Sequence, residues 1–168
     1  VAADKAQPGE WITGRGWHQD KWERVPGDAV EGVPVNDSLS EASPDNPVRL
    51  THASGHAYFA NDAALAAAGI DADTPDPRGG TIVRDADGEA TGMLRETARD
   101  FVDAAERQYA ESMLPEKRSA LDRERVRLAG DRALMYGVTS FQDAGERTRK
   151  FIDTIDFLKM LETEGELP

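Results

Sequence analysis

Cysteine is missing from the 168 residues of this chain, and long hydrophobic runs are missing as well. Without cysteine there is no disulfide framework, thiolate zinc site, iron–sulfur cluster or cysteine nucleophile. The longest apolar run, from Ala63 to Ala68, is far shorter than the roughly 20 residues that a membrane-spanning helix needs. No signal-peptide pattern opens the sequence. We therefore expect a cytoplasmic protein with no membrane partner.

Positive charge is also scarce. Lysine and arginine number 20 against 32 aspartate and glutamate residues, which gives a formal net charge of −12. Phosphate groups would be repelled by such a chain, so nucleic acid is excluded as a general partner. The length fits one domain of ordinary size, and 39% hydrophobic residues can build a modest core.

Both ends of the sequence look cut. The chain begins with Val1 instead of methionine, residues 1–5 are typical of the end of a helix, and residues 166–168 directly follow a helical stretch. We expect an internal section of a longer protein. Such a section would expose apolar faces that the rest of the protein covers, so we expect poor solubility or association between copies, including a homo-oligomer.

The order of predicted elements is typical of an α/β fold. Strands are expected at residues 11–17, 48–51, 57–60, 81–84, 90–94 and 138–141, and helical segments at residues 37–41, 62–68, 98–111, 115–136 and 147–164. Asp87-Gly88 is the strongest hairpin signal. Asn61 is placed to cap its helix and Gly69 to end it. From residue 115 onward, helix, strand, loop and helix form the repeating unit of such folds.

Two of the three histidines, His52 and His56, are four residues apart. That spacing binds zinc when both side chains lie on one helix. Here the pair follows a predicted strand, and four extended residues span about 13 Å, which is too far for one metal ion. The favoured alternative is that one histidine satisfies backbone groups at a turn while the other faces a cleft.

Two acidic residues come just after predicted strands. Taken alone, Arg95 and Glu96 are charges at a helix start, where the helix dipole favours a negative side chain, and a metal-ligand role for Glu96 is the alternative. Asp143 follows the strand at residues 138–141, at the end that carries the active site in a barrel of βα units. It could equally cap the loop or the next helix.

Three tryptophans, Trp11, Trp17 and Trp22, are crowded into twelve residues. Such residues line a substrate cleft or stack in a core, and the core is the more usual place. No phosphate-binding loop occurs, and the glycines at 14 and 16 lack the rest of a dinucleotide fingerprint.

Five motifs follow one another along nearly the whole chain. They are the tryptophan-rich segment 11–22, the segments 43–56 and 61–65 around the Gly-His pair, the segment 79–88, the Thr-Gly-Met-Leu-Arg-Glu segment 91–96 and the segment 137–145. In this order they resemble amidohydrolase family 3, in the branch that includes N-substituted formamide deformylase.

The resemblance implies a metal-dependent hydrolase on a (β/α)8 TIM barrel with an inserted small β-rich accessory region. It implies one or two divalent metal ions, with zinc as the first choice, in the full-length parent. The metal makes hydroxide from water and polarises the substrate carbonyl, so that a C–N bond of a small amide or formamide-like substrate is hydrolysed. Residues 1–97 would hold the start of the barrel and the accessory region, and residues 98–168 would hold βα units.

The resemblance also implies roles for individual residues. Glu96, which ends the Gly-Met-Leu-Arg-Glu motif, would be a metal ligand, and His56 at the Gly-His position would contact the substrate. His18 and Trp17 lie in a segment that the family also uses, and we place them on the substrate side. Asp143 would be a catalytic residue near the cleft.

The chain departs from the family in its metal ligands. No two of its three histidines are two residues apart, so the amino-terminal His-x-His pair is absent, and so are the later strand-end histidines and the final aspartate. A full barrel takes about 250 residues, so the barrel is incomplete here. We expect the section alone to hold no metal and to be inactive. The alternative is a non-catalytic α/β binding or interaction module that needs no metal.

Overall fold

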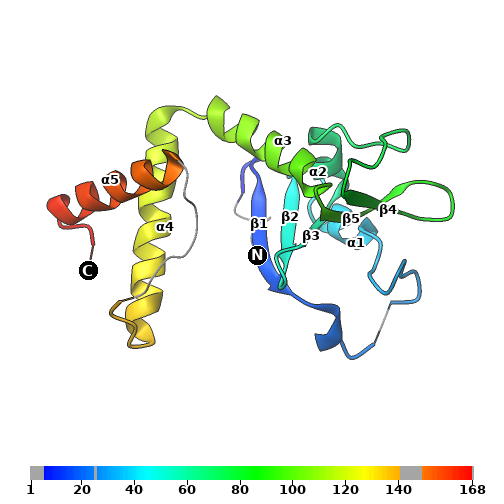
Figure 1. Cartoon of the computed structure of the whole chain (residues 1–168), viewed down its shortest axis with the longest axis horizontal. Helices are drawn as coiled ribbons and strands as arrows, with labels where there is room; N and C mark the ends of the chain where they lie inside the picture. Colours follow the sequence, from blue (N-terminus) through cyan, green and yellow to red (C-terminus); the bar gives the residue numbers. More distant parts are fainter. Residues whose placement is uncertain (1–5, 25, 141–148, 168) are drawn as a thin grey trace. The chain divides into compact units, whose positions relative to one another are not determined.

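The computed structural model describes residues 6–24, 26–140 and 149–167 (Figure 1). Contacts divide the chain into two compact units, Val1–Glu111 and Ser112–Pro168. The sequence instead predicts a boundary between residues 97 and 98, and the assignment of barrel and accessory regions to the two parts stays a prediction. Within the described residues, no helix combines the length and the apolar character needed to cross a membrane.

The first unit is organised around a five-stranded sheet (Figure 1). In spatial order the strands are β1 (Ile12–Trp17), β2 (Val48–His52), β3 (Ala57–Ala60), β5 (Ala90–Glu96) and β4 (Gly80–Arg84). β1 and β2 run parallel, and the other neighbouring pairs are antiparallel. All five strands are predicted by the sequence. The antiparallel β4–β5 pair is joined through the predicted turn, in which Gly88 has a φ of 90°.

A parallel pair of strands cannot be joined by a tight turn. The chain between β1 and β2 is therefore a long crossover, which carries the 3-10 helix η1 (Gln19–Lys21), a two-residue hairpin at residues 30–33 and α1 (Asp37–Ala42). This crossover brings polar side chains from early in the sequence to the ends of the central strands.

Alternation along the strands sorts apolar side chains onto the two faces of the sheet. One face packs against α2 (Asp62–Ala67) and α3 (Arg99–Ser112). Its buried cluster contains Tyr58, Ala60, Ile82 and Leu94 from the sheet, and Ala64, Leu65 and Val102 from the helices. The other face carries Ala57, Val83 and Met93, which pack with Val33 from the crossover. A helix layer thus covers the first face, and irregular chain covers the second.

Asn61 joins three separate backbone segments at the start of α2. Its side chain is fully buried. The Oδ1 atom accepts from the amides of Val48 at 2.7 Å and Ala64 at 3.0 Å. The Nδ2 group donates to the carbonyls of Ser43 at 2.8 Å and Asn46 at 2.9 Å. One side chain therefore caps the helix, as the sequence predicts, and also fixes the start of β2 and the preceding turn.

The second unit contains α4 (Pro115–Met135) and α5 (Arg149–Glu164). Arg123 on α4 donates to Glu164 at 2.6 Å and to Glu166 at 2.5 Å, and Leu161 is buried. Several large apolar side chains in this unit are exposed: Leu114, Leu121, Leu128, Leu134, Met135, Tyr136, Val138 and Met160. The expected association between copies stays a prediction.

The strand expected at residues 138–141 is not formed in its described part. Val138, Thr139 and Ser140 follow the end of α4 as irregular chain. A strand needs a neighbouring strand to satisfy its backbone groups, and none of the described residues of this unit forms one. Local β propensity alone does not supply that partner. Phe141 lies outside the described residues.

We predict that Asn61→Ala lowers the free energy of unfolding by at least about 3 kcal/mol, because it leaves buried amides and carbonyls from three segments unpaired. Asn61→Asp should be similarly harmful, since it places a buried carboxylate against two carbonyl groups. Urea unfolding followed by circular dichroism measures both.

Asn36→Ala is the matched comparison, because its Nδ2 group makes two hydrogen bonds, to Ala60 and Asp62. Its cost should be smaller, about 1–2 kcal/mol. An Asn61→Ala variant as stable as Asn36→Ala would contradict the joining role of Asn61.

Candidate active site

A cavity of about 340 Å³ lies at one end of the central strands, beside the Val33 cluster. It combines strand-end residues with residues of the crossover between β1 and β2. The polar side chains that line it include Gln19, Glu31, His52, His56, Arg95 and Glu96. Residues that are far apart in the sequence therefore line one polar cavity.

His56 and Glu96 meet in this cavity. The His56 Nδ1 atom lies 3.1 Å from Glu96 Oε2, and both side chains are more than half exposed. The backbone is linked as well, because the Glu96 amide donates to the His56 carbonyl at 2.9 Å. A carboxylate can only accept, so Nδ1 carries the proton of this hydrogen bond. In the neutral ring the other nitrogen, Nε2, is then an acceptor.

Glu96 has an uncommon backbone conformation, with a φ of 49°. It is the last residue of β5 and not the start of a helix, which corrects the interpretation of Arg95 and Glu96 from local sequence; α3 begins only at Arg99. Neighbouring side chains on a regular strand point to opposite faces. Arg95 and Glu96 nevertheless both line the cavity. The positive φ interrupts the alternation at the strand end, and the Arg99 Nε group stabilises it by donating to the Glu96 carbonyl at 2.9 Å.

His52 serves the structure of the turn after β2. Its Nδ1 atom lies 3.1 Å from the Ser54 amide and 2.8 Å from the Ser54 hydroxyl, and Nε2 lies 3.1 Å from Gln19 Oε1. Burial lowers the pKa of His52 from its usual value, and the nearby His18 adds to the effect, while Asp20 opposes it. His52 therefore satisfies the turn, as the favoured interpretation describes for one histidine, but both His52 and His56 line the cavity.

Trp17 and His18, two other predicted site residues, lie outside this cavity. Trp17 donates its indole N–H to the Leu50 carbonyl at 3.0 Å and packs edge-on against the His52 ring. The His18 ring lies 4.7 Å from the His52 ring and caps η1 by accepting from the Asp20 amide. Neither side chain is among the described residues that line the cavity. Asp143 lies outside the described residues, so its catalytic role stays a prediction.

Sequence reasoning missed Glu31 and Arg95 as a pair. They form an ion pair across the cavity, although 64 positions separate them in the sequence. The available signal was weak: Glu31-Gly32 between two valines forms a tight hairpin, but the usual dipeptides for that turn are Asn-Gly and Asp-Gly.

The side chains of the described residues fall short of the metal site that the resemblance implies. A zinc site uses at least three protein ligands. Within residues 6–24, 26–140 and 149–167, no three histidine, aspartate or glutamate side chains gather closely enough to hold one ion. His56 and Glu96 thus supply a pair of donor groups and not a complete site.

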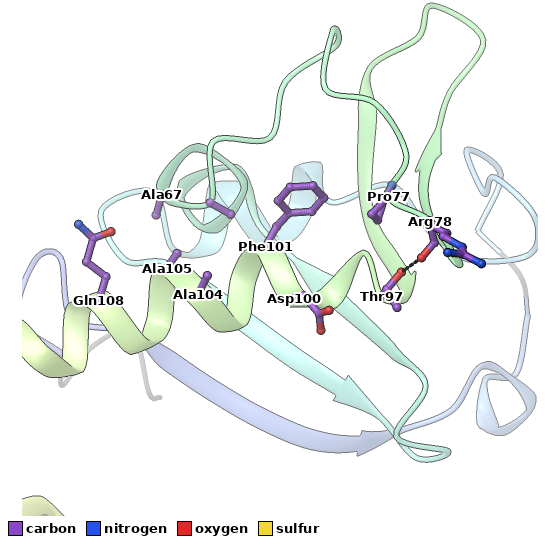
Figure 2. A pocket seen from close by; sticks show the side chains of 10 residues that line it. Ala67, Pro77, Arg78, Thr97, Asp100, Phe101, Ala104, Ala105 and Gln108 are labelled. Carbon is purple, nitrogen blue, oxygen red and sulfur yellow. Dashed lines mark hydrogen bonds between the residues drawn. The ribbon is translucent and has the colours of Figure 1, made fainter.

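A second cavity, of about 510 Å³, lies between α2, α3 and the loop before β4 (Figure 2). Small and apolar side chains dominate it, among them Ala67, Ala104 and Phe101, and Thr97 donates to the Arg78 carbonyl at its rim at 2.9 Å. It holds no histidine, and its charged groups are Arg78 and Asp100. With fewer groups for acid–base chemistry, it is the weaker candidate for an active site.

A profile of the amidohydrolase family matches residues 1–168, and the chain belongs to that family. It is 38% identical over 157 residues to the protein LONG AFTER FAR-RED 3 of Arabidopsis thaliana, covering 94% of this chain and 24% of that protein. It is 41% identical over 93 residues to the putative amidohydrolase YtcJ of Bacillus subtilis (strain 168), covering 55% and 16% of the two chains. It is also 41% identical over 105 residues to N-substituted formamide deformylase of Arthrobacter pascens, covering 62% and 18%.

Two solved structures share the fold. They are uncharacterized metal-dependent hydrolases from Pyrococcus horikoshii OT3, with a TM-score of 0.53 and 22% identity, and from Pyrococcus furiosus, with a TM-score of 0.50 and 24% identity. The matches cover 99% and 94% of this chain but 28% and 27% of those chains. The chain thus spans about a quarter or less of the proteins that it resembles. The predicted amidohydrolase resemblance is confirmed, and the complete barrel stays a prediction.

We predict that stability falls on acidification because of His52. Its pKa is lowered in the folded state, so the unfolded chain takes up the proton first. The stabilisation is complete above about pH 6.5, the usual value for histidine, and is lost as the pH falls from there toward the lowered pKa. Urea unfolding at several pH values from 7.5 to 5.5 measures the slope.

Two variants separate the two causes of the lowered His52 pKa, burial and the nearby His18. His52→Asn, which keeps an acceptor for the turn, should give the shallowest pH dependence of stability in this range. His18→Asn should give an intermediate one, because it removes only the second cause. Equal slopes in all three proteins would show that His52 does not control this pH dependence.

Proposed function

We propose that this chain is part of a metal-dependent amidohydrolase that hydrolyses a C–N bond of a small amide or formamide-like compound. The observation that carries the proposal is the family match along the whole chain. The similarity to a protein named N-substituted formamide deformylase favours formamide-like substrates. The two structural neighbours are uncharacterized metal-dependent hydrolases, which adds support for a divalent metal ion.

Within this proposal, His56 binds the substrate and Glu96 contributes to the metal site. Glu96 holds the proton on His56 Nδ1, so Nε2 is available to accept a hydrogen bond from an amide N–H of the substrate. A carboxylate has two oxygen atoms, and Glu96 can therefore serve His56 through Oε2 and a metal ion through Oε1. The second role is the one that the family resemblance implies.

The metal ion would supply Lewis acidity and an activated water. Because no three donor side chains cluster among the described residues, the remaining ligands would come from parts of the protein outside these residues. We keep zinc as the first choice of metal and one or two ions as the expected number. A cytoplasmic location also remains part of the proposal.

The competing proposal is a binding or interaction module without catalysis. Its support is the incomplete set of metal ligands among the described residues. The two proposals differ in what the full-length protein does with metal, since a module would carry none in a fixed ratio and would not hydrolyse amides. The enzyme is favoured because the family match spans the same residues that form the cavity.

We predict that Glu96→Gln in the full-length protein that carries this chain lowers both metal content and amide hydrolysis. Loss of a ligand should cost at least about tenfold to a hundredfold in metal affinity or activity. Metal content is measured by mass spectrometry of the purified protein, and hydrolysis by release of aniline from N-phenylformamide.

His56→Asn should raise KM with little change in metal content, which separates substrate binding from metal binding. Glu89→Gln, on the exposed turn between β4 and β5, removes the same charge and should leave both quantities unchanged. Normal metal content and normal hydrolysis in Glu96→Gln would overturn the metal role of Glu96. A wild-type protein with neither metal nor activity would favour the binding module.

A further inference from the structure

Two residues in the described part of the chain adopt a positive φ without being glycine, and both line the same cavity. They are Glu31, with a φ of 51°, and Glu96, with a φ of 49°. Side chains with a Cβ atom rarely adopt this conformation, and residues that do are concentrated at functional sites. Their coincidence marks the cavity independently of any family resemblance.

The backbone of Glu31 is held by a two-residue hairpin. The amide and carbonyl groups of Val30 and Val33 pair in both directions, at 2.9 and 3.1 Å. Glu31 and Gly32 both have positive φ, which is the geometry of a type I′ turn. Asparagine, aspartate or glycine is preferred where Glu31 stands. The turn alone therefore does not explain the choice of a long carboxylate at this position.

The contact that the Glu31 side chain makes explains why a long carboxylate stands at this position. Its carboxylate pairs with the Arg95 guanidinium, which lines the cavity and is only partly exposed. Arg95 is presented there by β5, opposite Ala57 of β3 and Thr81 of β4. An arginine in a cavity is a ready binding group for carboxylates. The ion pair with Glu31 occupies that group.

We propose that Glu31 is a specificity-determining residue: by neutralising Arg95 it keeps the cavity from binding small carboxylates and leaves it suited to uncharged amides. Glu96 lies on the same cavity and adds a second negative charge beside His56, so an entering anion meets no unpaired arginine or lysine among the described residues that line it. The inference rests on the proposed function only in taking this cavity as the place where substrate binds. For a hydrolase, it would also weaken binding of the carboxylate product.

The test uses acetate and acetamide as probes of the metal-free full-length protein that carries this chain, and it requires no turnover. Each probe is titrated at constant ionic strength, and binding is followed by NMR shifts of the amides of Gly79 and Thr81, which line the cavity. Glu31→Gln should bind acetate about fivefold more tightly than the wild type, the scale expected for one partly exposed ion pair. Acetamide affinity should stay the same.

Three further variants test whether the gain in acetate affinity comes from freeing Arg95. Glu31→Asn should show the same gain for acetate with an unstrained turn, so it covers the case in which Glu31→Gln does not fold. The Glu31→Gln/Arg95→Gln double variant should lose the gain. Glu89→Gln, which changes the net charge equally on an exposed turn, should bind acetate as the wild type does.

Equal acetate affinity in the wild type and in the folded Glu31 variants would overturn the proposal. A gain that persists without Arg95, or that Glu89→Gln reproduces, would do the same, because the effect would then come from another group or from net charge. These outcomes are independent of the amidohydrolase proposal, which fails only on metal content and amide hydrolysis of the full-length protein.

Discussion

The buried side chain of Asn61 is the constraint on which the first unit depends. Its four hydrogen bonds join the turn before β2, the first residue of β2 and the first turn of α2. An amide can satisfy two acceptors and two donors at once, which no apolar or singly charged side chain of that size can do. With these segments held together, β2 and β3 lie in register. The end of β2, which carries His52, then reaches the cavity.

The two faces of the sheet are covered by different kinds of structure. The face covered by α2 and α3 is closed by helical side chains and supplies most of the buried cluster. The opposite face is covered by the crossover, whose backbone is irregular and whose side chains are partly polar. Irregular chain can bring charged groups such as Glu31 against a strand end, because its direction is not fixed by a helical or strand repeat. The candidate site lies on this second side.

The motif order points to Glu96 and His56, and the structure places both on one cavity. Their metal and substrate roles stay predictions. The partners of these residues were not predictable, because ion pairs such as Glu31–Arg95 join positions 64 residues apart and leave no local signal. The strand expected at residues 138–141 failed for a related reason, since strand formation depends on a distant partner and not on propensity alone.

The sequence by itself determined the strand alternation, the caps at Asn61 and Gly69, the Asp87-Gly88 turn, the absence of cysteine chemistry and the family. These follow from local backbone preferences, from composition and from motif order. Only the tertiary structure decided that His56 meets Glu96, that His52 belongs to the turn, and that Glu31 neutralises Arg95. The physical reason is that these contacts join distant positions, which no short stretch of sequence specifies. The pairing of β3 with β5 brings His56 to Glu96, and the crossover between β1 and β2 brings Gln19 to His52 and Glu31 to Arg95.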